Sequence, residues 1–178
     1  MPKENARERI ARACMELLET TSLESLKTQD LMEKAGVSRS TFYRLFADKF
    51  EVANWIYQRE TEKIIRDYPD LKNWNEWSLV LHNYMRAHKK FFRNIAGYTG
   101  QNSFRDFLCR YFAGNVLKYR TGGDSEVTEE QRFAVQAFSL IGAQTTVDWI
   151  QNGFQPDDET LLGWLNACIP PCIRSFYQ

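Results

Sequence analysis

The sequence has no run of roughly 18 apolar residues, the length that a membrane-spanning helix needs. It begins with MPKENARERI, which is charged and has none of the apolar character of a secretory signal. It also contains no internal repeat and no low-complexity tract. These absences argue against a membrane protein, and we expect a cytoplasmic protein that engages no membrane.

The chain also lacks a net charge, because 23 basic side chains balance 23 acidic ones. Bulk charge therefore gives no reason to expect nucleic acid as a partner, and any affinity must come from local placement. Basic residues do gather between Lys34 and Lys49, where Arg39 and Arg44 join them and Asp48 is the single acid. A patch of this kind is typical of surfaces that contact phosphates.

Cysteine is scarce, and none of the cysteines shows the paired C-x-x-C spacing of a redox or zinc motif. The four cysteines are Cys14, Cys109, Cys168 and Cys172. Reduced thiols are therefore the favoured state. Cys168 and Cys172 lie one helical turn apart, which leaves a metal or redox pair open, but no nearby histidine or third cysteine completes a site, so packing is favoured.

Histidine is rarer still, and both His82 and His88 fall in one helical segment. A hydrogen-bonded structural role is favoured over a metal role for each. No Gly-rich phosphate loop occurs, and no nucleophile has a recognisable base beside it. The sequence thus predicts no catalytic residue, no metal site and no cofactor, and an enzyme built around an apolar pocket remains the weaker alternative.

What the sequence does contain is a pattern for two short helices joined by a tight turn, between Thr28 and Val52. The first helix has an apolar side formed by Leu31, Met32 and Ala35. Gly36 and Val37 break this helix, and Ser38 is well placed to cap the second one. The arrangement predicts a helix-turn-helix.

The second of these helices has two different faces. The apolar face consists of Phe42, Leu45 and Phe46. The other face consists of Ser40, Tyr43 and Arg44, flanked by Arg39 and Thr41. Such a basic, hydroxyl-rich face suits the major groove, because arginine reads guanine edges and hydroxyls bond to bases and phosphates. The alternative is a solvated surface helix whose arginines face water.

The segment AGVSRSTFYRLFADKFEV resembles the signature of the TetR family of bacterial transcriptional regulators. The matching residues are Ala35, Gly36, Val37, Ser38, Thr41, Tyr43, Phe46 and Lys49. The detailed resemblance covers roughly residues 3–57. One departure is Ser40, which stands where the family very often has glycine, so the operator of a relative does not carry over to this chain.

The resemblance implies a set of DNA-contacting residues: Thr28, Ser38, Arg39, Ser40, Thr41, Tyr43, Arg44 and Lys49. Thr28, Tyr43 and Lys49 are expected to contact DNA phosphates. The arginines and hydroxyls of the second helix are expected to select the DNA sequence. For Thr28, capping of the first helix is at least as well supported. Lys49 lies beside a predicted capping box of Asp48 and Glu51, and a solvated lysine is its alternative.

We expect an all-α fold of about nine helices, with a three-helix DNA-binding head and a helical effector-binding and dimerisation body. The domains are placed at residues 4–64 and 65–178. Further helices are predicted over residues 3–20, 48–68, 73–92, 103–116, 129–151 and 157–169, with loops at 94–102 and 121–127. Thr128 and Gln131 form a capping box, and Gly142 and Ala143 allow another helix to approach closely.

Aromatic residues make up 14% of the chain, more than one small core needs. An aromatic stripe is most often core, but an apolar cavity with a few polar groups is how small effectors are held. The predicted walls of such an effector pocket are Trp77, Tyr84, Phe107, Tyr111 and Trp149.

The family resemblance further implies a homodimer formed by the last two long helices. Its two reading helices would enter successive major grooves of a palindromic operator, about 34–36 Å apart. A ligand-responsive repressor is the favoured reading. As an alternative, the segment VDWIQNGFQPDDETL resembles the C-terminal ends of family members that activate dihydroxyacetone kinase genes, and such an activator or co-regulator would act through protein recruitment.

Overall fold

The computed structural model describes residues 5–71, 73–119 and 127–177, and within these ranges every regular element is helical. The helices are α1 (Ala6–Leu17), α2 (Thr28–Ala35), α3 (Arg39–Leu45), α4 (Lys49–Asp67), α5 (Trp74–Ala87), α6 (Lys89–Ala96), α7 (Phe104–Tyr119), α8 (Glu129–Gln151), α9 (Asp158–Ala167) and the 3-10 helix η2 (Pro171–Tyr177). The predicted all-α fold is confirmed.

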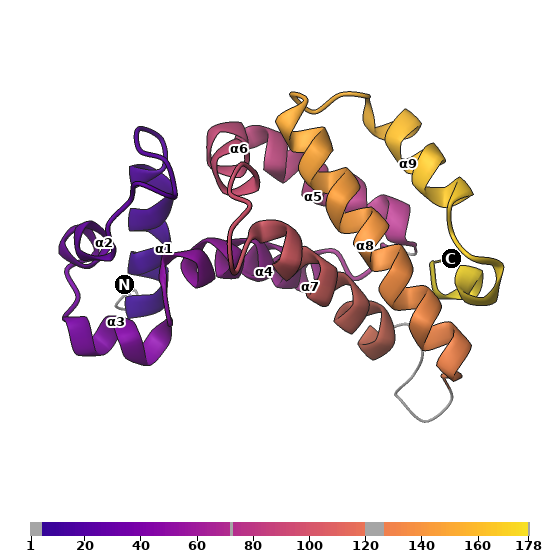
Figure 1. The fold of residues 1–178 in the computed structure, drawn as a ribbon, viewed down its shortest axis with the longest axis horizontal. Coiled ribbons are helices and arrows are strands. Elements are labelled where there is room, and N and C mark those ends of the chain that lie inside the picture. Colours follow the sequence, from indigo (N-terminus) through magenta and orange to yellow (C-terminus); the bar gives the residue numbers. More distant parts are fainter. Residues whose placement is uncertain (1–4, 72, 120–126, 178) are drawn as a thin grey trace.

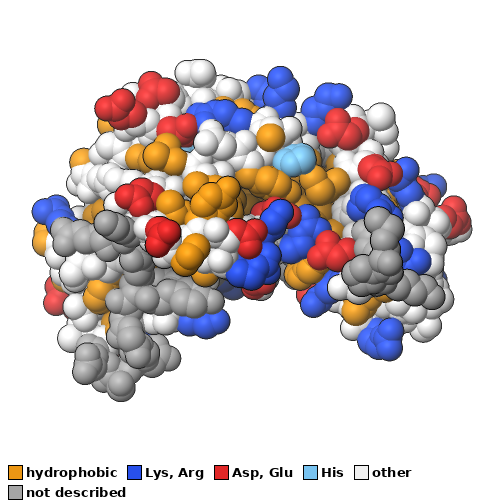
Figure 2. Space-filling model, turned by 180° about the vertical axis from the view of Figure 1, so that it is seen from behind, with side chains coloured by type: hydrophobic (Ala, Val, Ile, Leu, Met, Phe, Trp, Pro, Cys, Tyr) orange, Lys and Arg blue, Asp and Glu red, His pale blue; other side chains and the backbone are white. Residues whose placement is uncertain are grey.

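Helices α1, α2 and α3 form a head at one end of the molecule, and α5 to α9 form a body at the other (Figure 1). Helix α4 runs between them. Seen from behind, the two parts are separated by a notch along the lower edge, and side chains of both charge signs lie near it (Figure 2). An ion pair between Arg59 of α4 and Glu8 of α1, 2.5 Å long, fastens the connecting helix to the head.

The core of the head follows the predicted apolar pattern. Phe42 of α3 is fully buried together with Ile10 of α1 and Leu31 of α2. Phe46, just after α3, lies edge-on against Trp55 of α4, with 5.7 Å between the ring centroids. Burial of large aromatic groups at this point fixes α3 against both neighbouring helices.

Helix α4 begins with a cap that differs in one detail from the prediction. The Asp48 carboxylate accepts a hydrogen bond from the Glu51 N–H at 2.7 Å, as expected. The Glu51 carboxylate, however, reaches past Asp48 and accepts from the N–H of Ala47 at 2.5 Å. The helix ends at Asp67, before Pro69, because the residue before a proline is disfavoured in the helical conformation.

In the body, α7 packs along the length of α8 (Figure 1). Both predicted small residues contribute: Ala143 is fully buried, and a Cβ atom at Gly142 would lie 3.5 Å from the Phe112 ring of α7. The capping box at the start of α8 is present, with Thr128 and Gln131 bonded to each other's backbone N–H groups.

Three local predictions were wrong or fall outside the described residues. The single helix expected over 73–92 is divided at His88, whose backbone (φ −113°, ψ 38°) leaves the helical region and redirects the chain into α6. Thr28 does not cap α2, because Lys27 occupies the cap position without a side-chain bond and Thr28 is the first helical residue. Of the loop predicted at 121–127, residues 121–126 lie outside the described residues.

None of the four cysteines is in a disulfide. Burial raises the pKa of the Cys14 thiol to about 12, so it is an inert core group. Cys168 is exposed just after α9, which contradicts the prediction that it packs. Within the described ranges no three His, Cys, Asp or Glu side chains meet in a way that would hold a metal ion. Nor is any described helix both long and apolar enough to cross a bilayer.

Candidate nucleic-acid interface and body cavity

The turn between α2 and α3 has the geometry of a helix-turn-helix. Gly36 ends α2 in the left-handed conformation (φ +61°), which glycine adopts without steric cost. The Val37 N–H then donates back to the carbonyl of Met32 at 3.0 Å. Ser38 caps α3, with its hydroxyl accepting from the Thr41 N–H at 3.2 Å. The predicted roles of Gly36 and Ser38 at the turn are therefore confirmed.

The outer face of α3 carries the predicted polar side chains into solvent. Its exposed residues are Arg39, Ser40, Tyr43 and Arg44, and Thr41 is half-buried. The Arg39 guanidinium lies over the Tyr43 ring, 5.4 Å from its centroid. This contact holds two long side chains together on the exposed face of the helix.

The hydroxyls at the start of α3 are already bonded to one another. Ser38 donates to the Thr41 hydroxyl at 2.9 Å, and the Ser38 and Ser40 hydroxyls lie 3.0 Å apart. Ser38 therefore has a structural role in holding the N-terminus of α3. The Ser40 side chain, at the position where relatives often have glycine, joins this local network.

Lys49 is less free than the sequence indicates. Its ammonium donates to the carbonyl oxygens of Glu24 at 2.6 Å and Leu26 at 2.7 Å. Partial burial lowers the pKa of Lys49, although the nearby Glu24 and Asp48 carboxylates act in the opposite direction. Two of its three N–H groups thus fasten the start of α4 to the loop before α2, and one is left for an external anion.

Sequence reasoning missed Arg7, which supports the end of α3 from behind. Its guanidinium donates to the Leu45 carbonyl at 3.1 Å and lies over the rings of Phe46 and Trp55, 5.0 and 5.3 Å from their centroids. In the sequence, Arg7 is one of several charges in an N-terminal segment that looks uniformly solvated. Only the fold brings it to the last carbonyl groups of α3.

Asn94 was also missed, and it joins the head to the body. Its side-chain oxygen accepts from the Leu23 N–H at 2.7 Å, and its side-chain nitrogen donates to the carbonyls of Leu18 at 3.1 Å and Thr21 at 2.7 Å. One amide of α6 therefore satisfies three backbone groups of the loop between α1 and α2. We refer to these three bonds as the Asn94 clamp.

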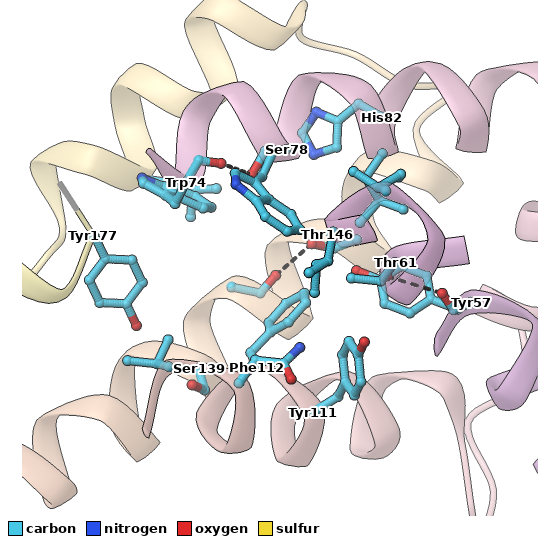
Figure 3. Close-up of a pocket in the computed structure, with 18 of the residues that line it drawn as sticks. Tyr57, Thr61, Trp74, Ser78, His82, Tyr111, Phe112, Ser139, Thr146 and Tyr177 are labelled. Atoms are coloured by element: carbon cyan, nitrogen blue, oxygen red, sulfur yellow. Dashed lines mark hydrogen bonds between the residues drawn. The ribbon is translucent and has the colours of Figure 1, made fainter. Parts of the chain in front are cut away.

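The body contains a cavity of about 360 Å³ between α4, α5, α7 and α8, a volume within the range of small-molecule sites. Figure 3 shows side chains from these helices pointing into it, among them Tyr57, Trp74, Tyr111 and Phe112. Of the predicted walls, Trp77 and Tyr111 line the cavity. Tyr84, Phe107 and Trp149 are not among its lining residues.

The three aromatic side chains that do not line the cavity pack against other rings. Tyr84 lies against Phe92, with 5.8 Å between centroids, and Phe107 lies edge-on to Tyr57 at 6.0 Å. Trp149 is almost fully buried, and its indole N–H donates to the Pro156 carbonyl at 2.8 Å. An aromatic pattern on a helix does not reveal which ring faces a filled interior and which faces an empty one.

His82 is buried and lines the cavity, and it belongs to a polar cluster with the half-buried Arg86 and Asp158. Its Nδ1 is 2.7 Å from a carboxylate oxygen of Asp158, the first residue of α9, and Arg86 holds the other oxygen. Burial lowers the pKa of His82, outweighing the opposite effect of Asp158. The imidazole is thus neutral and donates from Nδ1, which confirms the prediction of a hydrogen-bonded structural histidine.

A helix-turn-helix with an exposed basic face, joined by one long helix to a helical body with a cavity, defines a DNA-binding transcriptional regulator. The family described as "Bacterial regulatory proteins, tetR family" matches residues 10–54, and "Transcriptional regulator C-terminal region" matches residues 72–169. The chain belongs to the TetR family. It is a TetR-type transcriptional regulator and not an enzyme.

Similar proteins carry regulator names. The HTH-type dhaKLM operon transcriptional activator DhaS of Lactococcus lactis subsp. lactis (strain IL1403) is 28% identical over 86 residues, which are 48% of this chain and 46% of the relative. The match thus spans about half the length of that curated relative.

Two solved structures resemble the whole chain. A dihydroxyacetone kinase operon activator DhaS has a TM-score of 0.61 at 20% identity, over 92% of this chain and 96% of that one. The TetR family repressor AlkX from Dietzia sp. strain DQ12-45-1b has a TM-score of 0.50 at 16% identity, over 99% and 100%. At these identities the likeness concerns the fold.

Proposed function

We propose that the protein binds a palindromic DNA operator as a homodimer and releases it, as a repressor, when a small molecule occupies the body cavity. The observation that carries the DNA part is the outer face of α3, where Arg39, Tyr43 and Arg44 are exposed on a helix anchored by the buried Phe42. A short helix presented in this way fits the major groove.

Within this interface we assign two kinds of contact. Tyr43, Lys49 and Thr28 contact phosphates and set the register of the head on the duplex. The side chains that contact base edges are Arg39, Ser40, Thr41 and Arg44. Ser38, whose hydroxyl is engaged at the start of α3, acts by holding that helix in place.

The dimer is supported by apolar side chains that the subunit leaves uncovered on its last two long helices. In α8, Phe133 is 72% exposed, Leu140 60% and Ile141 45%, and in α9 Trp164 is 62% exposed. Phe133, Leu140 and Ile141 recur at i, i+7 and i+8 along α8 and so share one side of that helix. Large exposed apolar side chains that gather in this way mark an interaction surface. We propose that this surface pairs with its two-fold mate.

Helix α4 provides the physical connection between ligand and DNA. Its first residue, Lys49, bonds to the head, whereas Tyr57 and Thr61 further along line the cavity. The proposed domain boundary, after Ile64, lies inside this helix, so α4 belongs to both units. A ligand shifts the position of the heads only through its different affinity for the DNA-bound and free forms.

The test is selection of bound sequences from random duplex DNA by the full chain, followed by gel-shift titrations on the preferred site. We expect two half-sites about 34–36 Å apart, because each subunit places one α3 in a groove. Tyr43→Ala should weaken binding on all sequences alike, and Arg44→Ala should cost about 1–3 kcal/mol at one base position and relax its identity.

Arg174→Ala, which removes an exposed arginine of η2 in the body, is the matched control and should bind like the parent. Recovery of no preferred sequence would overturn the assignment, as would Tyr43 and Arg44 variants indistinguishable from the parent.

An activator is the second candidate, because the 28%-identical relative is named a transcriptional activator. In the segment that resembles dihydroxyacetone kinase regulators, Trp149 and Phe154 pack edge-on with 4.9 Å between centroids and are both buried, so these two aromatic side chains are not available to recruit a partner. A reporter gene placed behind the selected operator separates the candidates. Expression falls with a repressor and rises with an activator.

A further inference from the structure

The proposed effector site can be assigned a ligand chemistry, and this inference rests on the cavity being that site. The described residues that line the cavity include no Asp, Glu, Lys or Arg. The nearest cation along α5, Arg86, is held by the carboxylate of Asp158, which also holds His82. A charged ligand would therefore lose its hydration without gaining a counterion, which is strongly unfavourable.

Three of the four serine and threonine hydroxyls that line the cavity are already satisfied by their own helices. Thr61 donates to the Tyr57 carbonyl at 3.0 Å, Ser78 to the Trp74 carbonyl at 2.7 Å, and Thr146 to the Gly142 carbonyl at 2.8 Å. Because each hydroxyl proton is committed to a backbone oxygen, these three side chains contribute little to recognition. The dashed bonds in Figure 3 mark such intrahelical contacts.

Ser139 of α8 is different. Its side chain lines the cavity, is 2% exposed, and its Oγ has no hydrogen-bond partner among the described residues. A buried hydroxyl without a partner costs free energy that a bound polar group would recover. In the view of Figure 3, Ser139 is drawn on the side of the cavity opposite His82.

We propose that the cavity binds an uncharged, compact and mostly apolar molecule that carries one hydrogen-bonding group, and that Ser139 Oγ binds this group. The aromatic and aliphatic lining supplies the affinity, and the buried Ser139 hydroxyl, which has no partner among the described residues, supplies the orientation. The cavity volume of about 360 Å³ admits a molecule of two fused rings or a comparable chain.

The experiment compares three ligands that share one skeleton, namely naphthalene, 2-naphthol and 2-naphthoate, by calorimetric titration of the full chain without DNA. We expect 2-naphthol to bind roughly three- to tenfold more tightly than naphthalene, the range of one neutral hydrogen bond. 2-Naphthoate should bind more than about tenfold more weakly than 2-naphthol, because its charge has no partner.

Two serine variants test the orienting role. Ser139→Ala should bring 2-naphthol to the affinity of naphthalene and leave naphthalene unchanged. Ser78→Ala, the matched control, removes a hydroxyl that is bonded within its own helix and should preserve the difference between the two ligands. Without ligand, Ser139→Ala should melt no lower than the parent, because the lost hydroxyl has no partner.

Each contrary result has a distinct meaning. Tight binding of 2-naphthoate, or no binding of either neutral ligand up to its solubility, overturns the ligand class. A preference for 2-naphthol that persists in Ser139→Ala, or an equal loss for all three ligands, overturns the role of Ser139. None of these results bears on operator binding, because operator binding is measured without ligand. The DNA-binding proposal is therefore tested independently of the ligand proposal.

Discussion

At the scale of single residues, His82 joins the cavity to the last α-helix of the body. Its ring forms a hydrogen bond with Asp158 at the start of α9 and packs at a tilt against the Trp149 ring, with 4.4 Å between the ring centroids. Hydrogen bonds from Arg86 and His82 lower the pKa of Asp158 despite partial burial, which alone would raise it. The cluster is thus built around a charged carboxylate and a neutral imidazole.

This protonation state predicts a pH dependence of stability. Because the pKa of His82 is lower in the folded chain than the unperturbed 6.5, the unfolded chain takes up its proton first as the pH falls. The free energy of unfolding should therefore decrease as the pH falls below 6.5. Melting temperatures recorded between about pH 8 and pH 5 measure this decrease. His82→Gln should flatten the profile in this window, while His88→Gln, which lacks the contact with Asp158, should keep the slope of the parent.

How far the sequence predicts the site depends on the residue. The α3 face followed from spacing alone, because a helix buried on Phe42 and Phe46 must turn Tyr43 and Arg44 outward. The cavity walls did not follow, since Trp77 and Phe107 have the same chemistry but different neighbours. The pairing of distant elements decides which ring is left beside an empty space.

At the scale of elements, caps were more predictable than breaks. Helix α8 begins after Thr128 and ends before Gly153 as expected, since both signals are local in the sequence. The division between α5 and α6 at His88 has no glycine or proline to announce it. It places Phe91 and Phe92 in the core, so tertiary burial overrides the continuous helical pattern.

The Asn94 clamp gives a prediction at this scale. Asn94→Ala should lower the free energy of unfolding by about 1–3 kcal/mol, because the Leu23 N–H and two carbonyls lose their partner. Chemical denaturation measures the change. Asn83→Ala, at an exposed position of α5, is the control and should stay within about 0.5 kcal/mol of the parent. An Asn94 variant as stable as the parent would show that the loop holds its position without α6.

At the scale of the whole molecule, the proposed dimer surface gives the next prediction. Leu140→Glu should produce monomers in sedimentation experiments, because a carboxylate would be buried against the two-fold mate. Operator affinity should fall with it, since one head then binds one half-site. Leu79→Glu makes the same change at an exposed position of α5 and should remain dimeric. A dimeric Leu140→Glu protein would exclude α8 as the pairing helix.

Helix α4 has a mechanical consequence for how the regulator responds. From Lys49, bonded to the head, to Thr61 at the cavity, the helix rises about 18 Å at 1.5 Å per residue. Pivoting such a rod by about 5° displaces its far end by roughly 1.5 Å, half the length of a hydrogen bond. Under the proposed regulation, an effector therefore need not open the body, because a rotation of α4 by a few degrees would be enough to shift the reading head relative to the DNA.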